Sequence, residues 1–222
     1  MTEITLPDWE SAVGVPVREL AAAARLARDE AEARKTERKN LIRPRLRELH
    51  DARQTTVKDR CGRAYSLLER KAGGGVTTVL NREKFAREHP DLVRRAYVRG
   101  NRFVYRDPDI RPVTHHLLRQ DYAELRPTEL VEATLEIAEL VAAANRRFLD
   151  AKTELETALR GVWDGEETVF GCGRRLGLYR TTFSSAAAID LLDDPSPYVT
   201  TRPRQPSLYV EIVPVRCDEG AE

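Results

Sequence analysis

Cys61-Gly62-Arg63 and Cys172-Gly173-Arg174 are the same tripeptide, and each opens a stretch of chain with the same order of landmarks. A short apolar segment follows each tripeptide, Ala64-Tyr65-Ser66-Leu67-Leu68 in the first stretch and Leu176-Gly177-Leu178-Tyr179 in the second. Short apolar runs between turn residues are typical of β-strands. The sequence therefore predicts that one structural module occurs twice.

The later landmarks of the two stretches also correspond. Asn81 and Asp190 each follow an apolar pair, and both residue types cap helix N-termini. A helix-sized piece, a proline and a final strand come next in both stretches. We therefore expect a β-β-α-β module at residues 61–108, with its hairpin turning at Gly73-Gly74-Gly75, and a second copy at residues 161–215 in which the spacings from cysteine to cap and from cap to proline are shorter.

Equivalent copies should bury equivalent residues. Cys61 and Cys172 are expected to be small buried residues at matching strand starts. Because side chains alternate along a strand, every second residue of each final strand is expected to point inward. These residues are Phe103 and Tyr105 in the first copy and Leu208 and Val210 in the second. The alternative is a chance match of short motifs.

A long helical arm is expected before each module. Residues 17–60 combine strong helix formers with Pro44, which must kink the helix or begin a new one. Residues 128–160 carry a heptad seam. The seam positions are Leu130, Thr134, Ile137, Val141, Ala144, Phe148, Ala151, Leu155 and Ala158. The arms are expected to pack as an antiparallel coiled-coil-like hairpin, with self-association of the seam between two chains as the alternative.

Together these elements predict an α+β fold in which two long helices carry two small modules related by a pseudo-twofold axis. Residues 1–16 and 216–222 are expected to be tails, and residues 109–127 a linker.

The composition bounds the class of protein. The 222 residues include 37 basic and 36 acidic side chains, so the net charge of +1 does not by itself indicate a nucleic-acid partner. The basic residues are nearly all arginine, which suits phosphate and carboxylate oxygens but also follows from a GC-rich genome. Three cysteines, an N-terminus without an apolar targeting segment and the lack of a membrane-length apolar run predict a cytoplasmic protein without a membrane partner.

The chemistry-bearing residues do not form a recognisable catalytic motif. His115-His116 with Asp121 invites a metal interpretation, but adjacent histidines on a helix diverge, whereas zinc helices use i, i+4 spacing. Gly73-Gly74-Gly75 lacks the lysine and hydroxyl residue of a phosphate loop. We therefore expect no catalytic residues, no metal and no cofactor.

Arginines of the two modules form the candidate site, and tyrosines are interleaved with them. Arginine with tyrosine on a small sheet suits contacts to phosphates, bases and riboses. The alternative is that these arginines pair with the chain's acids and protect strand edges. The candidate nucleic-acid-binding residues are Arg94, Arg95, Arg99, Arg102, Arg106, Arg174, Arg175, Arg180, Arg202 and Arg204.

Part of the chain resembles the Gam-type host-nuclease inhibitors and related siphophage coiled-coil proteins. The matching pieces are the helical arm ending at Arg60, the stretch Asn81 to Leu92 and the strand Arg102-Phe103-Val104-Tyr105. The resemblance implies a non-enzymatic phage or prophage protein that binds double-stranded DNA or protects its ends, usually as a dimer. This chain carries two copies of the arm and module. The resemblance therefore implies that the pair within one chain takes the place of the homodimer.

Two functions follow as hypotheses. The first is DNA binding or DNA-end protection through the arginine-rich modules. The second is a protein-interaction or assembly module that docks a partner helix, or a second copy of the chain, through the seam of residues 130–158.

Overall fold

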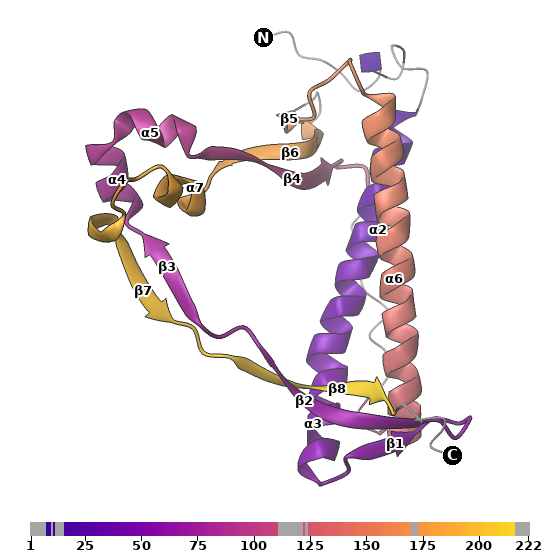
Figure 1. Ribbon diagram of the computed structural model, residues 1–222. Helices are drawn as coiled ribbons and strands as arrows, with labels where there is room; N and C mark the ends of the chain where they lie inside the picture. The colour runs from indigo at the N-terminus through magenta and orange to yellow at the C-terminus, as the bar shows by residue number, and fades with distance from the viewer. Residues whose placement is uncertain are drawn as a thin grey trace, which may run out of the picture. The chain divides into compact units, whose positions relative to one another are not determined.

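The computed structural model describes residues 8–9, 11, 16–110, 122, 124–169 and 173–215, and it is a mixed α+β structure (Figure 1). The mixed class confirms the coarse fold prediction. Contacts divide the chain into two discontinuous compact units. Unit 1 comprises Met1–Arg25, Gly74–Arg111 and Leu149–Gln205, and unit 2 comprises Leu26–Gly73, Pro112–Phe148 and Pro206–Glu222.

The first helical arm consists of three consecutive segments: α2 (Val17–Glu37), the π-helical η1 (Arg38–Ile42) and α3 (Arg43–Asp51). Pro44 stands in the first turn of α3, directly after the π-turn. A proline has no amide proton to donate to the preceding turn, and a π-turn is one way in which a continuous helix absorbs that loss. The helix thus passes Pro44 with a local irregularity.

The arm is shorter than expected. It ends at Asp51 and not near residue 60, because Arg53 adopts φ 64°, outside the right-handed helical region. The β-branched residues that follow form strand β1 (Thr56–Lys58).

The second arm, α6 (Pro127–Ala158), confirms the predicted long helix. Of its seam, Leu130, Thr134, Ile137, Ala144 and Leu155 are buried within the single chain, and the other positions are half-buried. In unit 2, the Nη2 of Arg147 on α6 donates to Glu30 Oε2 on α2 at 3.0 Å. Knobs-into-holes packing between the arms stays a prediction.

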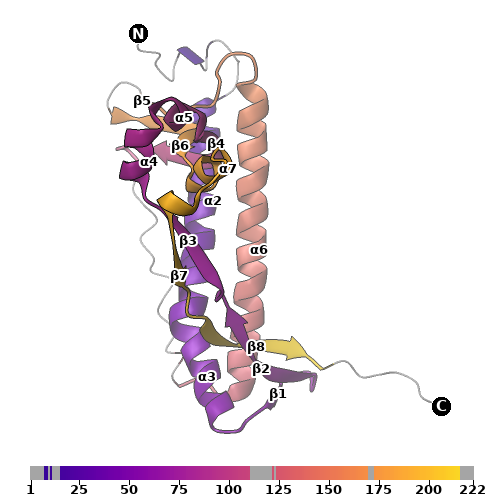
Figure 2. The same cartoon turned by 60° about the vertical axis from the view of Figure 1, so that its left-hand side comes forward.

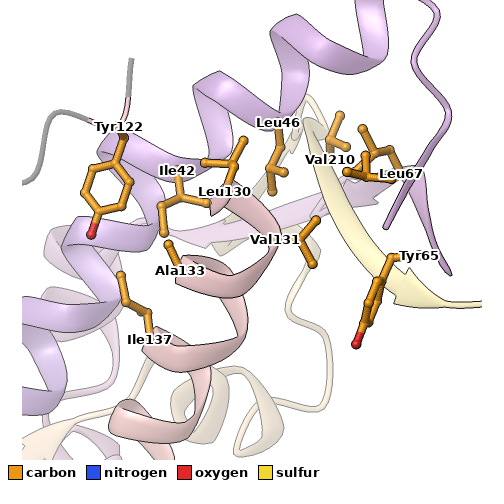
Figure 3. Packing of buried hydrophobic residues seen from close by; sticks show 11 residues of the cluster. Ile42, Leu46, Tyr65, Leu67, Tyr122, Leu130, Val131, Ala133, Ile137 and Val210 are labelled. Carbon is orange, nitrogen blue, oxygen red and sulfur yellow. The ribbon is translucent and has the colours of Figure 1, made fainter. Parts of the chain in front are cut away.

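Unit 2 contains a three-stranded antiparallel sheet in the order β1-β2-β8, where β2 is Ala64–Ala72 and β8 is Ser207–Pro214. Its inner face packs on α3 and on the first half of α6 (Figure 3). Leu67 and Val210 of the sheet are almost fully buried in this core together with Leu46 and Val131.

Unit 1 contains a three-stranded sheet in the order β4-β6-β5 and a two-stranded ribbon β3-β7. The strands of the sheet are β4 (Tyr97–Arg106), β5 (Thr168–Val169) and β6 (Arg175–Phe183), and those of the ribbon are β3 (Val76–Leu80) and β7 (Val199–Pro203). Four short helices gather at one end of the ribbon (Figure 2): α4 (Arg82–Glu88), α5 (Pro90–Arg95), α7 (Ser185–Asp190) and η3 (Ser196–Tyr198). Phe85 lies fully buried among them.

The two stretches do not share one element order. The first runs β2-β3-α4-α5-β4, close to the prediction, and the Asn81 side chain accepts a hydrogen bond from Lys84 N at 3.0 Å as the expected N-cap. The second, at residues 161–215, runs β5-β6-α7-η3-β7-β8: two strands precede its helix, but they are β5 and β6 rather than the segments at residues 176–179 and 188–189, and two strands follow it. Residues 188–189 are helical rather than a strand, because the Ser184 side chain caps an alanine-rich helix at Ala187 N. Asp190 therefore ends a helix.

The predicted hairpin around the three glycines is also wrong. Gly73, Gly74 and Gly75 all have positive φ, but β2 and β3 on either side of them do not pair with each other. Instead, β2 pairs with β8 and β3 pairs with β7, both antiparallel. The glycine segment is a joint between two strands that each pair with the second stretch.

Each three-stranded sheet combines strands from both stretches. The hairpin β1-β2 is completed by β8, the last strand of the second stretch, and the pair β5-β6 is completed by β4, the last strand of the first. Gly62 and Gly173 both have positive φ in the turns before β2 and β6. Each sheet is therefore built from two strands joined by a turn and the last strand of the other stretch. The duplication itself stays a prediction.

Burial of the matching residues agrees only in part. Phe103, Tyr105 and Val210 are buried as expected, but Leu208 is 40% exposed. Cys61 is exposed in the turn between β1 and β2, so the prediction that it is buried is wrong. Cys172 lies outside the described residues. A cysteine in a tight turn has no core beside it, because a hairpin turn projects beyond the sheet.

Candidate nucleic-acid interface

All ten arginines of the candidate site belong to unit 1. Five of them lie on the paired strands β4 and β6, which carry no acidic residue. We call β4 and β6 the arginine strand pair; its arginines are Arg99, Arg102, Arg106, Arg175 and Arg180. The other five lie at the end of α5, before β6 and at the end of β7.

The register of the arginine strand pair decides which arginines share a face. Arg106 is the Cα partner of Arg175, and Arg99 is the partner of Thr181. Since partners in an antiparallel pair point to the same side, Arg99, Arg106 and Arg175 share one face. Arg180 is opposite Gly100 and lies on the other face. Arg102 stands at a β-bulge between Asn101 and Val104, where a strand can re-aim a side chain.

Two arginines of the shared face have partners within unit 1. The Arg99 guanidinium lies over the Tyr179 ring at 4.2 Å, and its Nε lies 3.7 Å from Glu166 Oε1. Arg175 Nη1 lies 3.7 Å from Glu167 Oε1. Arg99 Nη2 also donates to the Asp164 carbonyl. Both ion pairs are at the long end of ion pairing and both side chains are about half exposed, so each guanidinium keeps further donors for a ligand.

Arg102, Arg106 and Arg180 are exposed and form no ion pair with any residue that the structure describes. The pairing of Arg106 with Arg175 puts two like charges directly opposite each other, which destabilises an antiparallel pair. An anion bound between them would remove that repulsion. The strand pair therefore presents cationic donors in an arrangement that favours a phosphate.

Arg174 has a structural role that the sequence did not reveal. Its Nε lies 3.2 Å from Asp107 Oδ2, and its Nη2 donates to Asp109 Oδ2 at 2.6 Å. The Asp107 side chain is fully buried and also accepts from Arg18 Nε at 2.9 Å and from the Tyr105 hydroxyl at 3.0 Å. Arg174 is thus part of a network around a buried carboxylate.

The network shifts the pKa of its members. Burial alone would raise the Asp107 pKa, but hydrogen bonds from the Asp109 backbone, Tyr105 and the two arginines outweigh it and lower the pKa below its ordinary value. Burial, followed by the hydrogen bond to Asp107, raises the pKa of Tyr105 to about 12. Asp107 is therefore a carboxylate at neutral pH, held by the α2 arginine on one side and the arginine before β6 on the other.

The remaining candidate arginines are exposed. Arg94 and Arg95 end helix α5, Arg202 lies opposite Thr77 in the β3-β7 ribbon, and the Arg204 backbone donates to Gly75 O at 2.9 Å. None of these four side chains forms an ion pair within residues 16–110, 124–169 and 173–215. These four side chains are further exposed positive charges in unit 1.

The tyrosines play different parts. Tyr97 is 43% exposed and available to a ligand, whereas Tyr105 is buried. The Tyr198 hydroxyl donates to Glu88 Oε2 at 3.0 Å, which ties it to α4. Only Tyr97, and Tyr179 beneath Arg99, fit the expected role in packing against nucleotides.

The candidate metal ligands and the question of a membrane-spanning helix can be compared with only part of the structure. His115, His116 and Asp121 lie outside the described residues. Among the residues that are described, no three histidine, cysteine or acidic side chains gather as a metal site requires. No helix in that same part of the chain has the length and apolar character needed to cross a membrane.

Comparison of the chain with protein-family models, with curated proteins and with solved structures gives no match. The geometry of the arginines is therefore the basis for a functional proposal.

A stability measurement separates a binding role of Arg106 from a structural one. We expect Arg106→Gln to stabilise the protein by about 0.5 kcal/mol, because it removes the like-charge contact with Arg175. Urea unfolding at low ionic strength measures this, with Arg94→Gln as a control outside the strand pair. A loss of stability on Arg106→Gln would show that the fold needs this arginine.

Proposed function

We propose that the chain is a non-enzymatic DNA-binding protein that holds the phosphate backbone of double-stranded DNA through the arginine strand pair. The observation that carries the proposal is the concentration of five arginines and no acidic residue on β4 and β6, with Arg102, Arg106 and Arg180 exposed and without ion pairs in the described chain. In a chain with a net charge of +1, such a local excess is not a consequence of overall composition.

The chemistry of the site suits phosphates rather than bases. Arginine donates in a planar fork that matches phosphate oxygens, and most protein–DNA hydrogen bonds go to the backbone. Binding of this kind is electrostatic and independent of base sequence. A role in protecting DNA ends of phage or prophage type is the corresponding biological setting, as the Gam-type resemblance implies.

The alternative, a partner helix or second chain docked on the heptad seam, has less support. Leu130, Ile137 and Leu155 of the seam are each at most 3% exposed within the single chain. A partner helix would have to displace the contacts that bury them. The seam is therefore better explained as part of the core.

Fluorescence anisotropy of a labelled DNA duplex tests the proposed function. We expect binding at low salt and an affinity that falls steeply as salt is added, because bound counterions are released from the DNA. Duplexes of unrelated sequence should bind alike. No binding at the lowest salt at which the protein is soluble would refute the proposal.

A further inference from the structure

Unit 2 contains a groove of about 350 Å³ with a cationic wall. Three basic residues of η1 and α3 form one side, and the first residues of β8 form the other. The groove is lined by Lys39, Arg43, Pro44, Arg47, Ser207, Leu208 and Tyr209, with no acidic residue among them. The proposed DNA-binding function makes no use of these residues.

The three cations stand four residues apart, so they project from the same side of the helix, about 6 Å from one to the next. Like charges at this spacing repel each other, and a concave wall concentrates their field. Lys39 and Arg43 form no ion pair with the described residues, and Arg47 has only a 3.6 Å contact with the exposed Asp51. The charge of the groove is therefore largely uncompensated.

Tyr209 orients the central cation. The Arg43 guanidinium lies over the Tyr209 ring with 4.3 Å between its central carbon and the ring centroid. A stacked guanidinium keeps its N–H groups in its own plane, where they stay available to an acceptor. Arg43 is half-buried and thus held in place, while Lys39 and Arg47 are exposed on either side.

We propose that this groove binds a chain of adjacent phosphate groups, carried by a nucleic-acid strand or by free polyphosphate. The cationic wall offers only hydrogen-bond donors, and a phosphate chain offers only acceptors along its backbone. An acidic peptide would also bring backbone N–H donors, for which the lining side chains offer only the Ser207 and Tyr209 hydroxyl oxygens. Repeated charges about 6 Å apart suit a repeating anion better than a single one.

Calorimetry with inorganic tripolyphosphate, and anisotropy with a short labelled single-stranded oligonucleotide, test the groove directly. We expect the triple variant Lys39→Gln/Arg43→Gln/Arg47→Gln to weaken binding of the ligand about a hundredfold. The matched control Lys58→Gln/Arg63→Gln/Arg146→Gln removes three charges elsewhere in unit 2 and should change binding less than about threefold. Lys39→Gln/Arg47→Gln, which leaves the Arg43–Tyr209 stack intact, provides a variant whose folding is not at risk.

The two binding assays distinguish a nucleic-acid strand from free polyphosphate as the source of the phosphates. Loss of oligonucleotide binding identifies a nucleic-acid strand, and loss of tripolyphosphate binding alone identifies free polyphosphate. Binding of neither probe to the wild-type chain, equal losses in the groove and control variants, or preference for a glutamate-rich peptide would overturn the inference. The Arg102→Gln/Arg106→Gln variant keeps the groove intact, so a failure of the DNA proposal is recognised separately.

Discussion

Replacement of Arg102 and Arg106 by glutamine is expected to weaken DNA-duplex binding about a hundredfold at low salt. Each arginine is exposed and has no carboxylate partner in the described chain, so its donors are free for a phosphate. A charge-assisted hydrogen bond contributes about 1.5 kcal/mol or more, which is about tenfold in affinity for each contact. The slope of log K against log salt should fall by about 1.8, because two phosphate contacts are lost.

A matched variant makes this result interpretable. Lys84→Gln/Arg87→Gln also removes two charges from unit 1, but both residues lie on α4, outside the strand pair. We expect it to change affinity less than about threefold and to leave the salt slope nearly unchanged. Equal losses in both variants would mean that total charge, and not the arginine strand pair, determines binding.

Asp107→Asn is expected to destabilise the protein by about 3 kcal/mol. The substitution leaves the guanidinium groups of Arg18 and Arg174 facing a buried neutral amide in place of a carboxylate. Chemical denaturation followed by circular dichroism measures the effect. Asp109→Asn is the control, because Asp109 contacts the same two arginines at 3.0 and 2.6 Å but is 61% exposed. The control should lose less than about 1 kcal/mol, and equal losses would contradict the role of buried Asp107.

The same carboxylate predicts a dependence of stability on pH. Because folding lowers the Asp107 pKa, its contribution is fully present above the unfolded value of about 3.9 and is lost as pH falls through the lowered folded value. The difference in unfolding free energy between the wild-type chain and Asp107→Asn should therefore be constant above about pH 5 and shrink at more acid pH. A difference that stays constant into acid would rule out this titration.

The sequence predicted features that depend on local patterns. A heptad seam sustained over about four heptads identified α6, and Asn81 before a helix-sized stretch identified the N-cap of α4. The short helix of the second module, α7, was expected to begin after Asp190, but it begins after Ser184. Both residues can cap a helix N-terminus, and only the three alanines close behind Ser184 favour a helix there. When two possible N-cap residues lie close together, the cap residue type alone does not show which one begins the helix.

Pairing between distant strands was not predictable in this way. A strand's apolar pattern shows which face is buried but not which strand lies beside it, so the exchange of β4 and β8 between the two sheets left no local signal. The glycine segment between β2 and β3 has the composition of a hairpin turn and the positive φ values of one, yet it joins strands that pair elsewhere.

The residues of the candidate site were predicted from residue type alone. The structure shows which of these arginines have acidic partners far away in the sequence. Arg174 looked equivalent to the other arginines, but it contacts Asp107, 67 positions earlier in the chain. Asp107 itself stands before Pro108 at the end of the first module, where an acidic residue is ordinary. Cationic residues at 39, 43 and 47 stand four apart in the first helical arm, but the sequence does not show that residues 207–209 lie opposite them and complete a groove.

Arginine-selective modification with phenylglyoxal, read by mass spectrometry with and without duplex DNA, shows whether Arg102 and Arg106 contact the DNA. We expect DNA to protect Arg102 and Arg106 from modification and the protection to disappear at high salt. Arg87 should react equally in both states, since its partner is Glu88. Unchanged modification of Arg102 and Arg106 under conditions where the DNA is bound would contradict binding through the arginine strand pair.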